Sequence, residues 1–375
     1  MGRKAESVSW KVTVNICRFL LAACFIFSGF VKAVDPVGTQ IKIQDYLSAF
    51  GHGMPMQSDV LLIACLLAGF EFFLGVYLLL GIYRDEMTVT LLVVLACFTS
   101  LTLYIALKNP VSDCGCFGDA LVLTNWQTFY KNIFLLLLAI ILLIGKRYVI
   151  PLISERVAWV ALIITITLPG HFMLSNIREL PMFDFRPYKV GTDLRKSVLE
   201  GRDSRYADFS LMGNDMDDMT ESVLSAEGYT FLLISPYLEN ASQENIDRIN
   251  DLYYYCLEGD YPMYCVTASS EGWISQWREI TCAEYEFLRS DEIPLQTMIR
   301  RNPGVVVLKD GVIYAKWSDS NMPLDFDSFA KMENLDWKHP VLRSAFVKWT
   351  FTVIYFVLPY LLLLLADVCI KRKKK

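Results

Sequence analysis

Two cysteines separated by one glycine are the residues of this chain best suited to chemistry. Cys114 and Cys116 lie in the polar stretch Asp113–Asp119, which contains two glycines and is placed between long apolar segments. A Cys-x-Cys disulfide closes a small ring, and a flexible central Gly115 lets the two sulfurs approach the usual disulfide geometry. Such a ring stays strained, and a strained, exposed disulfide exchanges readily with other thiols. The spacing therefore predicts a thiol–disulfide redox centre.

Other interpretations of these two cysteines remain open. In one, the disulfide is a fixed staple of the loop; in another, the two thiols never react, since reactivity depends on exposure and thiolate formation. A zinc site is disfavoured, because structural zinc takes four Cys or His ligands. The chain has only three histidines, His52, His171 and His339. We therefore expect no metal.

The composition indicates a membrane protein. Hydrophobic residues make up 54% of the chain and its mean hydropathy is +0.36, too apolar for an ordinary soluble domain. The apolar residues cluster into segments of about 20 residues, enough to cross a bilayer core. These segments lie near Val12–Val34, Asp59–Ile82, Met87–Leu107, Phe129–Gly145, Val157–Leu174 and Lys348–Asp367. We expect six membrane spans and the lipid bilayer as a partner.

The placement of Lys and Arg predicts the orientation of these spans. Basic residues precede the first span, separate the second from the third and the fourth from the fifth, and follow the sixth. They are Arg3, Lys4, Lys11, Arg84, Lys146, Arg147, Arg156 and Lys371–Lys375. By the positive-inside rule both termini are cytoplasmic. We expect an inner-membrane protein whose cysteine loop and long segment between spans five and six are periplasmic.

The long segment between spans five and six is acidic, which limits the classes of molecule that it can bind. Residues Asn176–Leu342 contain 16 Lys and Arg against 29 Asp and Glu. Nucleic acid is a poor partner for such a surface, so we expect an exported thiol protein or another redox partner. Cys256, Cys265 and Cys282 of this segment are interpreted as core or structural thiols, with Cys282 the best exposed. Whether any of the three forms a disulfide stays open.

Three charged residues are predicted inside the first two spans. Glu71 lies near the middle of the second span, and Arg18 and Lys32 lie in the first. A carboxylate near the bilayer midplane is costly unless it is paired or functional. Counted from the span centres, Arg18 and Glu71 differ by ~9 Å in depth. We predict a Glu71–Arg18 pair, with Lys32 as the other candidate partner; the pair either locks two helices or serves proton or quinone chemistry.

Several short motifs of the first 150 residues carry a family resemblance. They are Ser-Gly-x-x-Lys with Asp-Pro over Ser28–Pro36, a glutamate followed by Leu-Gly over Glu71–Gly75, and Cys-Gly-Cys-Phe-Gly over Cys114–Gly118. Together they resemble the MauE branch of the DoxX-like membrane proteins, over about residues 10–150. The resemblance implies a four-helix membrane unit associated with thiol or quinone redox chemistry, often with disulfide formation in exported partners. Quinone is thus the one cofactor that it suggests.

The outer loop Asp35–Ser58 reads as a short amphipathic segment on the membrane surface. It contains no cysteine. Four-helix enzymes of the vitamin K epoxide reductase type pass electrons between two cysteine pairs. The membrane part of this chain offers one exposed pair, which weighs against a complete enzyme of that type.

The composition changes after the fifth span. Leu180–Tyr206 is mixed and reads as a connector or an added hairpin. The following pattern alternates strands and helices and ends in a hairpin with an Asp-Gly turn. The expected elements are a strand Tyr229–Ser235, a helix Asn240–Glu258, a strand Pro262–Ala268, a helix Ser270–Arg278 and paired strands Gly304–Lys309 and Val312–Trp317.

This order resembles a thioredoxin-like domain over about Leu211–Phe329. Pro303 matches the cis-proline of that family, which lies beside the active cysteines. The position that normally reads Cys-x-x-Cys follows the first strand and here begins Ser235-Pro236. The resemblance therefore implies a redox-silent domain, with Pro303, Ser235 and Pro236 on a surface used for recognition.

The sequence predicts an α-helical membrane protein with an α/β thioredoxin-like soluble domain. Its expected parts are a four-helix membrane domain (1–150), a fifth membrane helix (151–175), a periplasmic connector and thioredoxin-like domain (176–345), and a last membrane helix with a basic tail (346–375). Two functions remain. In the first, Cys114 and Cys116 carry out thiol–disulfide exchange, coupled to a quinone; in the alternative, the chain is a non-enzymatic scaffold or assembly factor for exported proteins.

Overall fold

The computed structural model of the 375-residue chain describes residues 2–51, 56–111, 113–201, 203–215, 217–322 and 340–373. The chain divides into two compact units. The membrane unit comprises Met1–Asn176 and Ser344–Lys375; the second unit, Ile177–Arg343, is called the outer unit after the side of the membrane expected for it from the sequence. Each unit has its own core, so each is described by itself.

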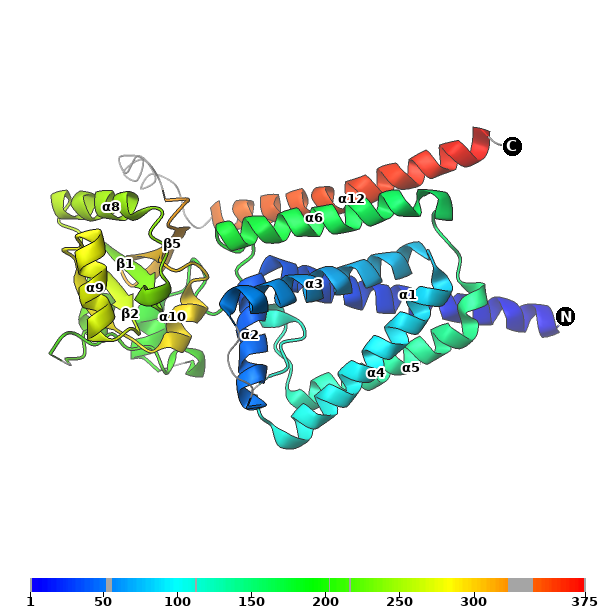
Figure 1. Cartoon of the computed structure of the whole chain (residues 1–375), viewed down its shortest axis with the longest axis horizontal. Coiled ribbons are helices and arrows are strands. Elements are labelled where there is room, and N and C mark those ends of the chain that lie inside the picture. The colour runs from blue at the N-terminus through cyan, green and yellow to red at the C-terminus, as the bar shows by residue number, and fades with distance from the viewer. Residues whose placement is uncertain are drawn as a thin grey trace. The chain divides into compact units, whose positions relative to one another are not determined.

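Long apolar helices build the membrane unit. They are α1 (Gly2–Val34), α3 (Gln57–Leu80), α4 (Arg84–Lys108), α5 (Asn125–Gly145), α6 (Ala158–Arg178) and α12 (Pro340–Lys373), with the shorter α2 (Pro36–Ala49) between α1 and α3. Among the described residues, six helices are long and apolar enough to cross a membrane. The six predicted spans are therefore confirmed, and the protein is a multi-pass membrane protein. Both ends of the chain lie at the same end of this unit (Figure 1).

Two glycines set the packing of α1 against α3. A Cβ on Gly29 would lie 2.5 Å from the backbone nitrogen of Phe72, and one on Gly75 would lie 2.6 Å from that of Ile26. The two backbones approach this closely because neither glycine has a side chain. The contacts fix an antiparallel register in which Gly29 lies opposite Phe72.

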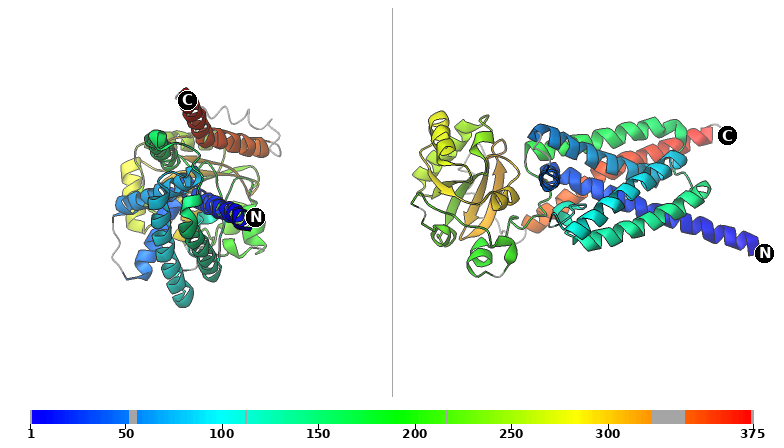
Figure 2. Two further views of the ribbon diagram at one scale, coloured as in Figure 1. Left: turned by 90° about the vertical axis from the view of Figure 1, so that its right-hand side faces the viewer. Right: turned by 60° about the horizontal axis from the view of Figure 1, so that its bottom comes forward.

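The remaining membrane helices pair in a similar way. Within the four-helix part, α4 lies beside α5, and Asn132 Nδ2 donates to Thr102 Oγ1 at 3.2 Å. The last two helices, α6 and α12, lie side by side, with 2.8 Å between Thr165 Oγ1 and Tyr360 OH (Figures 1 and 2). Side-chain hydrogen bonds between helices are favoured where water is absent.

A five-stranded mixed sheet forms the centre of the outer unit. The strands are β1 (Tyr229–Ser235), β2 (Met263–Thr267), β3 (Glu286–Arg289), β4 (Gly304–Lys309) and β5 (Val312–Ser318), in the order β3-β2-β1-β4-β5. Strands β1, β2 and β3 are parallel, whereas β4 and β5 are antiparallel to their neighbours. Three parallel strands, β1 to β3, followed by the antiparallel hairpin of β4 and β5 confirm the expected thioredoxin-like fold class.

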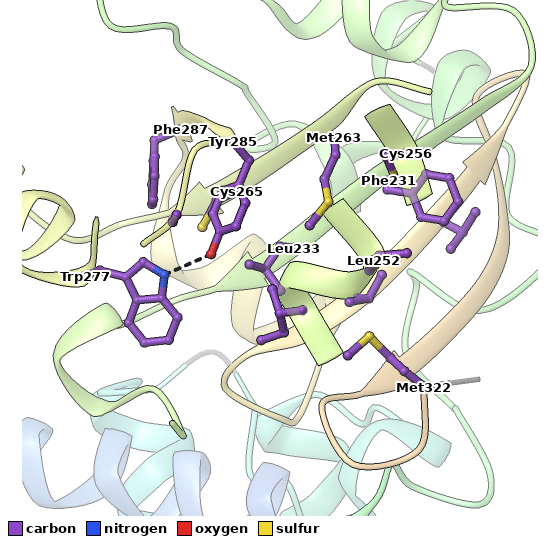
Figure 3. Packing of buried hydrophobic residues seen from close by; sticks show 14 of the residues in the cluster. Phe231, Leu233, Leu252, Cys256, Met263, Cys265, Trp277, Tyr285, Phe287 and Met322 are labelled. Atoms are coloured by element: carbon purple, nitrogen blue, oxygen red, sulfur yellow. Dashed lines mark hydrogen bonds between the residues drawn. The ribbon is translucent and has the colours of Figure 1, made fainter. Parts of the chain in front are cut away.

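Helices and the residues before β1 cover the sheet. The helices are α7 (Thr220–Leu224), α8 (Ile246–Glu258), α9 (Glu271–Thr281) and α10 (Glu292–Met298). Buried side chains of α8 and α9 pack on one face, where Trp277 Nε1 donates to Tyr285 OH at 3.0 Å (Figure 3). Cys256 and Cys265 are 1% and 0% exposed in this core, which confirms their interpretation as core thiols. Exposed Cys282 ends α9.

The segment expected to be a connector is part of the fold instead. Its side chains Tyr188, Leu194 and Tyr206 are buried in the second core, on the other face of the sheet. Its backbone also covers the β5 edge, where Gly191 N donates to Ile313 O at 2.7 Å. Sheet edges left open are sites of unwanted pairing, so this polar stretch stabilises the sheet.

Buried charges fasten that segment to the sheet. Asp184 accepts hydrogen bonds from Arg186 Nε at 2.7 Å and from Lys316 Nζ, on β5, at 2.9 Å. Burial alone would raise the pKa of the Asp184 carboxyl, but the charges of Arg186 and Lys316 outweigh it and lower the pKa to about 2. The carboxylate is therefore ionised at neutral pH.

Two elements of the outer unit were missed. The sequence predicted neither β3 nor α10, and it began the helix before β2 at Asn240, whereas α8 begins at Ile246. Strand β3 has only four residues with a charge at each end, which gives no alternating pattern to detect. Its outer edge pairs with Met212, whose N–H donates to Arg289 O at 2.8 Å.

Candidate redox site

The Cys-Gly-Cys loop is a tight turn that brings its two sulfurs together. The Sγ atoms of Cys114 and Cys116 are 2.8 Å apart, and both residues are half-buried. Gly115 has a φ of +64° and Gly118 one of +50°, values that favour glycine. A disulfide bond is about 2.05 Å long, so closing the bond requires less than about 1 Å of movement. All ten cysteines lie in the described part of the chain, and all are free.

Helix α1 holds the backbone of this loop from one side. Lys32 Nζ donates to the carbonyl oxygen of Cys116 at 2.7 Å, and Ser28 Oγ donates to the same oxygen at 2.8 Å. Lys32 and Ser28 are four residues apart, so both side chains leave the same face of the helix. The resemblance motif Ser-Gly-x-x-Lys thus has a local purpose, which is to fix the carbonyl of Cys116.

Helix α2 holds the loop from the other side. Lys42 Nζ forms an ion pair with Asp113 Oδ1 at 2.6 Å, and Tyr46 OH donates to the carbonyl oxygen of Cys114 at 2.8 Å. A Cβ on Gly115 would lie 3.2 Å from Lys42 Cγ. The sequence predicted a surface segment here and missed both supporting residues, although their spacing of four residues places them on one helical face.

The partner of Glu71 is Lys32. Their side chains are 4% and 6% exposed and form an ion pair at 2.7 Å. The predicted Glu71–Arg18 pair is wrong, because the register between α1 and α3 places Gly81, at the end of α3, next to Arg18. Arg18 Nη1 instead donates to Ile150 O at 2.6 Å. Lys32, the other candidate partner, is thus buried against Glu71 and does not reach water.

A small cavity lies beneath Cys116. Its lining includes Cys24, Glu71, Cys116, Lys131 and Asn132. Its volume is about 30 Å³, which suits one or two water molecules. An engineered cavity of about 150 Å³ is needed for a benzene ring, so a quinone ring does not fit here. The lining combines Glu71, Lys131 and Asn132 with apolar side chains that include Phe25 and Phe98.

The two thiols of the loop differ in acidity. A hydrogen bond from the Cys114 thiol lowers the pKa of Cys116 to about 6; burial opposes this change, while the charges of Lys131 and Lys32 assist it. The same hydrogen bond, followed by burial, raises the pKa of Cys114. Cys116 therefore ionises first and is the better nucleophile of the pair near neutral pH.

The second predicted site, in the outer unit, is closed. Ser235, Pro236 and Pro303 lie close to one another but all three are buried, and the Asn302–Pro303 peptide bond is cis. Ser235 Oγ donates to Asn302 Oδ1 at 2.6 Å, and Asn302 Nδ2 donates to Tyr237 O at 2.6 Å. Side-chain hydrogen bonds occupy the position where the thioredoxin-like resemblance places a cysteine pair.

Burial keeps two of the outer cysteines unreactive. It raises the pKa of Cys256 to about 12 and also raises the pKa of Cys265. Thiols of this kind are inert towards exchange. The structure thus gathers Cys114, Cys116, Lys32 and Glu71 into one site and leaves Arg18 apart from it.

Similarity to known proteins covers parts of this chain. No curated protein matches the chain. A solved structure titled "Solution structure of a putative protein disulfide isomerase from Bacteroides thetaiotaomicron" shares 14% identity over 40% of this chain and 90% of that one, with a TM-score of 0.29. A score of that size supports no conclusion, and the fold of the outer unit rests on its own strand order. The family described as "Methylamine utilisation protein MauE" matches residues 10–145. The membrane unit is therefore similar to the MauE family over these residues.

Proposed function

We propose that this protein carries out thiol–disulfide exchange through Cys114 and Cys116. The observation that carries the proposal is the 2.8 Å separation of the two sulfurs on a loop whose backbone is held by α1 and α2. Sulfurs held this close convert between dithiol and disulfide without rearrangement of the loop. A membrane domain similar to the MauE family, next to a thioredoxin-like outer unit, is consistent with a redox-associated role.

The exchange needs no additional redox group. In the oxidising direction, a thiolate of the partner attacks one sulfur of the Cys114–Cys116 disulfide and forms a mixed disulfide. The second thiolate of the partner then attacks its own sulfur in that bond, so the partner leaves with a disulfide and this protein keeps two thiols. Two electrons pass from partner to protein, and the thiols released on Cys114 and Cys116 take up the two protons. No step passes through a quinone.

The partner that suits this chemistry is an exported protein with a pair of cysteines. The positive-inside rule places the loop and the acidic outer unit outside the cytoplasm, with both termini inside. An oxidising compartment there maintains disulfides. The outer unit is then available to hold the partner while the membrane domain exchanges sulfur bonds with it.

A second candidate function rests on a different observation. The position of the cysteine pair in the outer unit is filled by hydrogen bonds among Ser235, Tyr237 and Asn302. This favours a scaffold or assembly factor, in which the outer unit binds an exported protein and no electrons move. In that case the loop thiols serve only to hold the loop.

Thiol trapping in cells tests the proposal. We expect the Cys114 and Cys116 pair to shift from disulfide to dithiol when growth conditions change from oxidising to reducing. Cys114→Ser removes the disulfide that a partner thiolate would attack, so this variant should no longer oxidise its partner. In the reverse direction the Cys116 thiolate attacks a disulfide of the partner and releases one partner thiolate, and the resulting mixed disulfide should accumulate because Cys114 is not there to resolve it. Cys282→Ser is the matched control, because Cys282 is an exposed free thiol outside the loop. An unchanged oxidation state together with no trapped partner would leave the scaffold as the function.

A further inference from the structure

A guanidinium without an acidic partner among the described residues is buried near the middle of α1, away from the end of that helix that holds the cysteine loop. Arg18 is 1% exposed, and Nη1 donates to Ile150 O at 2.6 Å. Its Nε is buried and has no hydrogen-bond partner. No ion pair among the described residues involves Arg18. A buried charge without an ion pair is costly, and the contact of the guanidinium carbon with the Phe19 ring, 4.5 Å from its centroid, offsets part of that cost.

Arg18 lies at the level where α3 ends and α4 begins, whereas α1 itself continues beyond this level. A Cβ on Gly81, which follows α3, would lie 2.8 Å from Arg18 Nη1. Ile150 follows α5, and Arg84 begins α4. Three helices therefore start or stop at the level of Arg18. Such a level corresponds to the border of the hydrocarbon core, where lipid headgroups lie.

A small cavity at this level is positively charged. Arg18 and Arg84 both line it, and Thr88, Gly81 and Tyr77 are among the other lining residues. None of the lining residues is Asp or Glu. The nearest carboxylate, Asp85, pairs with Lys146 at 2.7 Å and lies 3.9 Å from Arg84 Nε. The charges that face the cavity are therefore those of two arginines.

The beginning of α4 adds to this potential. Tyr83 precedes the helix and provides no side-chain hydrogen bond to its first turn. The macrodipole of this 25-residue helix favours an anion at this end, and the carboxylates of Asp85 and Glu86 in its first turn offset part of that effect. The remaining lining residues include Leu78, Met87 and Leu142. An anionic oxygen attached to an apolar molecule matches this combination of charged and apolar walls.

We propose that this cavity binds a phosphate group of an anionic lipid, with Arg18 and Arg84 as its ligands. The cavity has a volume of about 10 Å³, which admits about one oxygen atom. One phosphate oxygen then accepts hydrogen bonds from the Arg18 guanidinium inside the cavity. The rest of the phosphate stays at the rim, within reach of the exposed Arg84 side chain. Arginine suits this role because its planar donors match phosphate.

Lipid binding to the purified full chain tests the proposal. Native mass spectrometry would follow the titration of detergent-solubilised protein with phosphatidylglycerol and, separately, with phosphatidylcholine. We expect phosphatidylglycerol to bind more tightly than phosphatidylcholine. Arg84→Gln should weaken phosphatidylglycerol about tenfold, or about 1.4 kcal/mol, and Arg18→Lys should weaken it while retaining the charge. Arg156→Gln is the matched control, because Arg156 is exposed, lies beyond α5 and does not line the cavity.

The source of the phosphate is settled by a second arm of the experiment. Inorganic phosphate added in place of the lipid should not raise the thermal unfolding midpoint of the wild-type protein. Stabilisation by inorganic phosphate that is lost in Arg84→Gln would overturn the assignment to lipid, because the cavity would then bind an anion from solution. Equal phosphatidylglycerol affinities for wild type, Arg84→Gln and Arg18→Lys would overturn the site itself. Arg84→Gln keeps the test valid if Arg18 variants do not fold, since Arg84 is exposed.

Discussion

The acidity of Cys116 can be measured directly and decides which thiol attacks. A thiol with the pKa of about 6 found for Cys116 is about 9% ionised at pH 5, whereas an unperturbed cysteine with a pKa of about 8.5 is about 0.03% ionised. The thiolate fraction is therefore about 300 times larger. A thiolate of lower pKa is also a weaker nucleophile, here by about 10-fold to 18-fold, since the Brønsted coefficient is about 0.4–0.5. The expected net advantage in alkylation rate at pH 5 is about 20-fold.

The alkylation rates must be compared at an acidic pH, because the difference between the two kinds of thiol is small at neutral pH. At pH 7 the ionised fractions are about 90% and about 3%, and the weaker nucleophilicity removes most of that difference. The assay is alkylation of the reduced full chain by iodoacetamide, followed by mass spectrometry of the peptide that contains each cysteine. Exposed Cys282 reports that the reagent is active. The reasoning is refuted if Cys114 is alkylated before Cys116, or if the rate for Cys116 rises only with a midpoint near that of free cysteine.

The charge of Lys131 should lower the pH midpoint at which Cys116 becomes reactive towards iodoacetamide. Lys131 lines the cavity with Cys116, and its Nζ lies 4.3 Å from the ring centroid of Phe117. The other charged residues around Cys116 are Lys32 and Glu71, which pair with each other. Lys131→Met should raise the alkylation midpoint of Cys116 by about one pH unit, because a nearby opposite charge lowers an acid pKa by about 1–3. Lys131→Arg keeps the charge and should leave the midpoint close to that of the wild type.

Three further predictions concern stability of the full chain, each measured by thermal unfolding in detergent. Glu71→Gln leaves a buried lysine without its counter-charge and should lower the free energy of unfolding by about 3 kcal/mol. An unchanged unfolding midpoint would show that the ion pair does not stabilise the fold. Gly29→Leu should destabilise strongly because a Cβ there meets the α3 backbone, whereas Gly69→Leu, where a Cβ meets nothing within 4 Å, should have little effect. Asp184→Asn should cost about 3–5 kcal/mol because Lys316 stays buried. Since folding lowers the pKa of Asp184 to about 2, its contribution is complete above about pH 4 and is lost as the pH falls through 2.

Local patterns of the sequence predicted those parts of the fold that depend on local interactions. The apolar segments became the membrane helices, and the strands Tyr229–Ser235 and Gly304–Lys309 were predicted with their observed bounds. Long apolar runs and a hairpin with an Asp-Gly turn are strong local signals. The segment Leu180–Tyr206 was misread because its buried side chains are spread among polar residues, and only the completed sheet provides the edges that it covers.

The partner of Glu71 could not be predicted from depth along the spans. When the centres of the first two spans are aligned, Arg18 and Glu71 differ by only ~9 Å in depth, and this alignment was the basis of the predicted pair. The actual register is set by Gly29 and Gly75, whose missing side chains let the α1 and α3 backbones approach. That register brings Lys32 to Glu71 and leaves Arg18 at the level of the helix ends. Small residues at helix contacts are thus a better guide to register than span centres.

Hydrogen bonds from α1 and α2 hold the backbone of the cysteine loop and leave its two sulfurs available for the proposed exchange. Lys32, Ser28 and Tyr46 donate their hydrogen bonds to carbonyl oxygens of the two cysteines. The carbonyls stay in place whether the sulfurs are bonded to each other, to a partner or to hydrogen, so these contacts do not have to break during exchange. In the proposed exchange the loop backbone therefore stays in place, and the two sulfurs move by less than about 1 Å to form or break their bond. Cys116 faces the charged cavity, and the choice of the attacking thiol then depends on that environment and not on a movement of the loop.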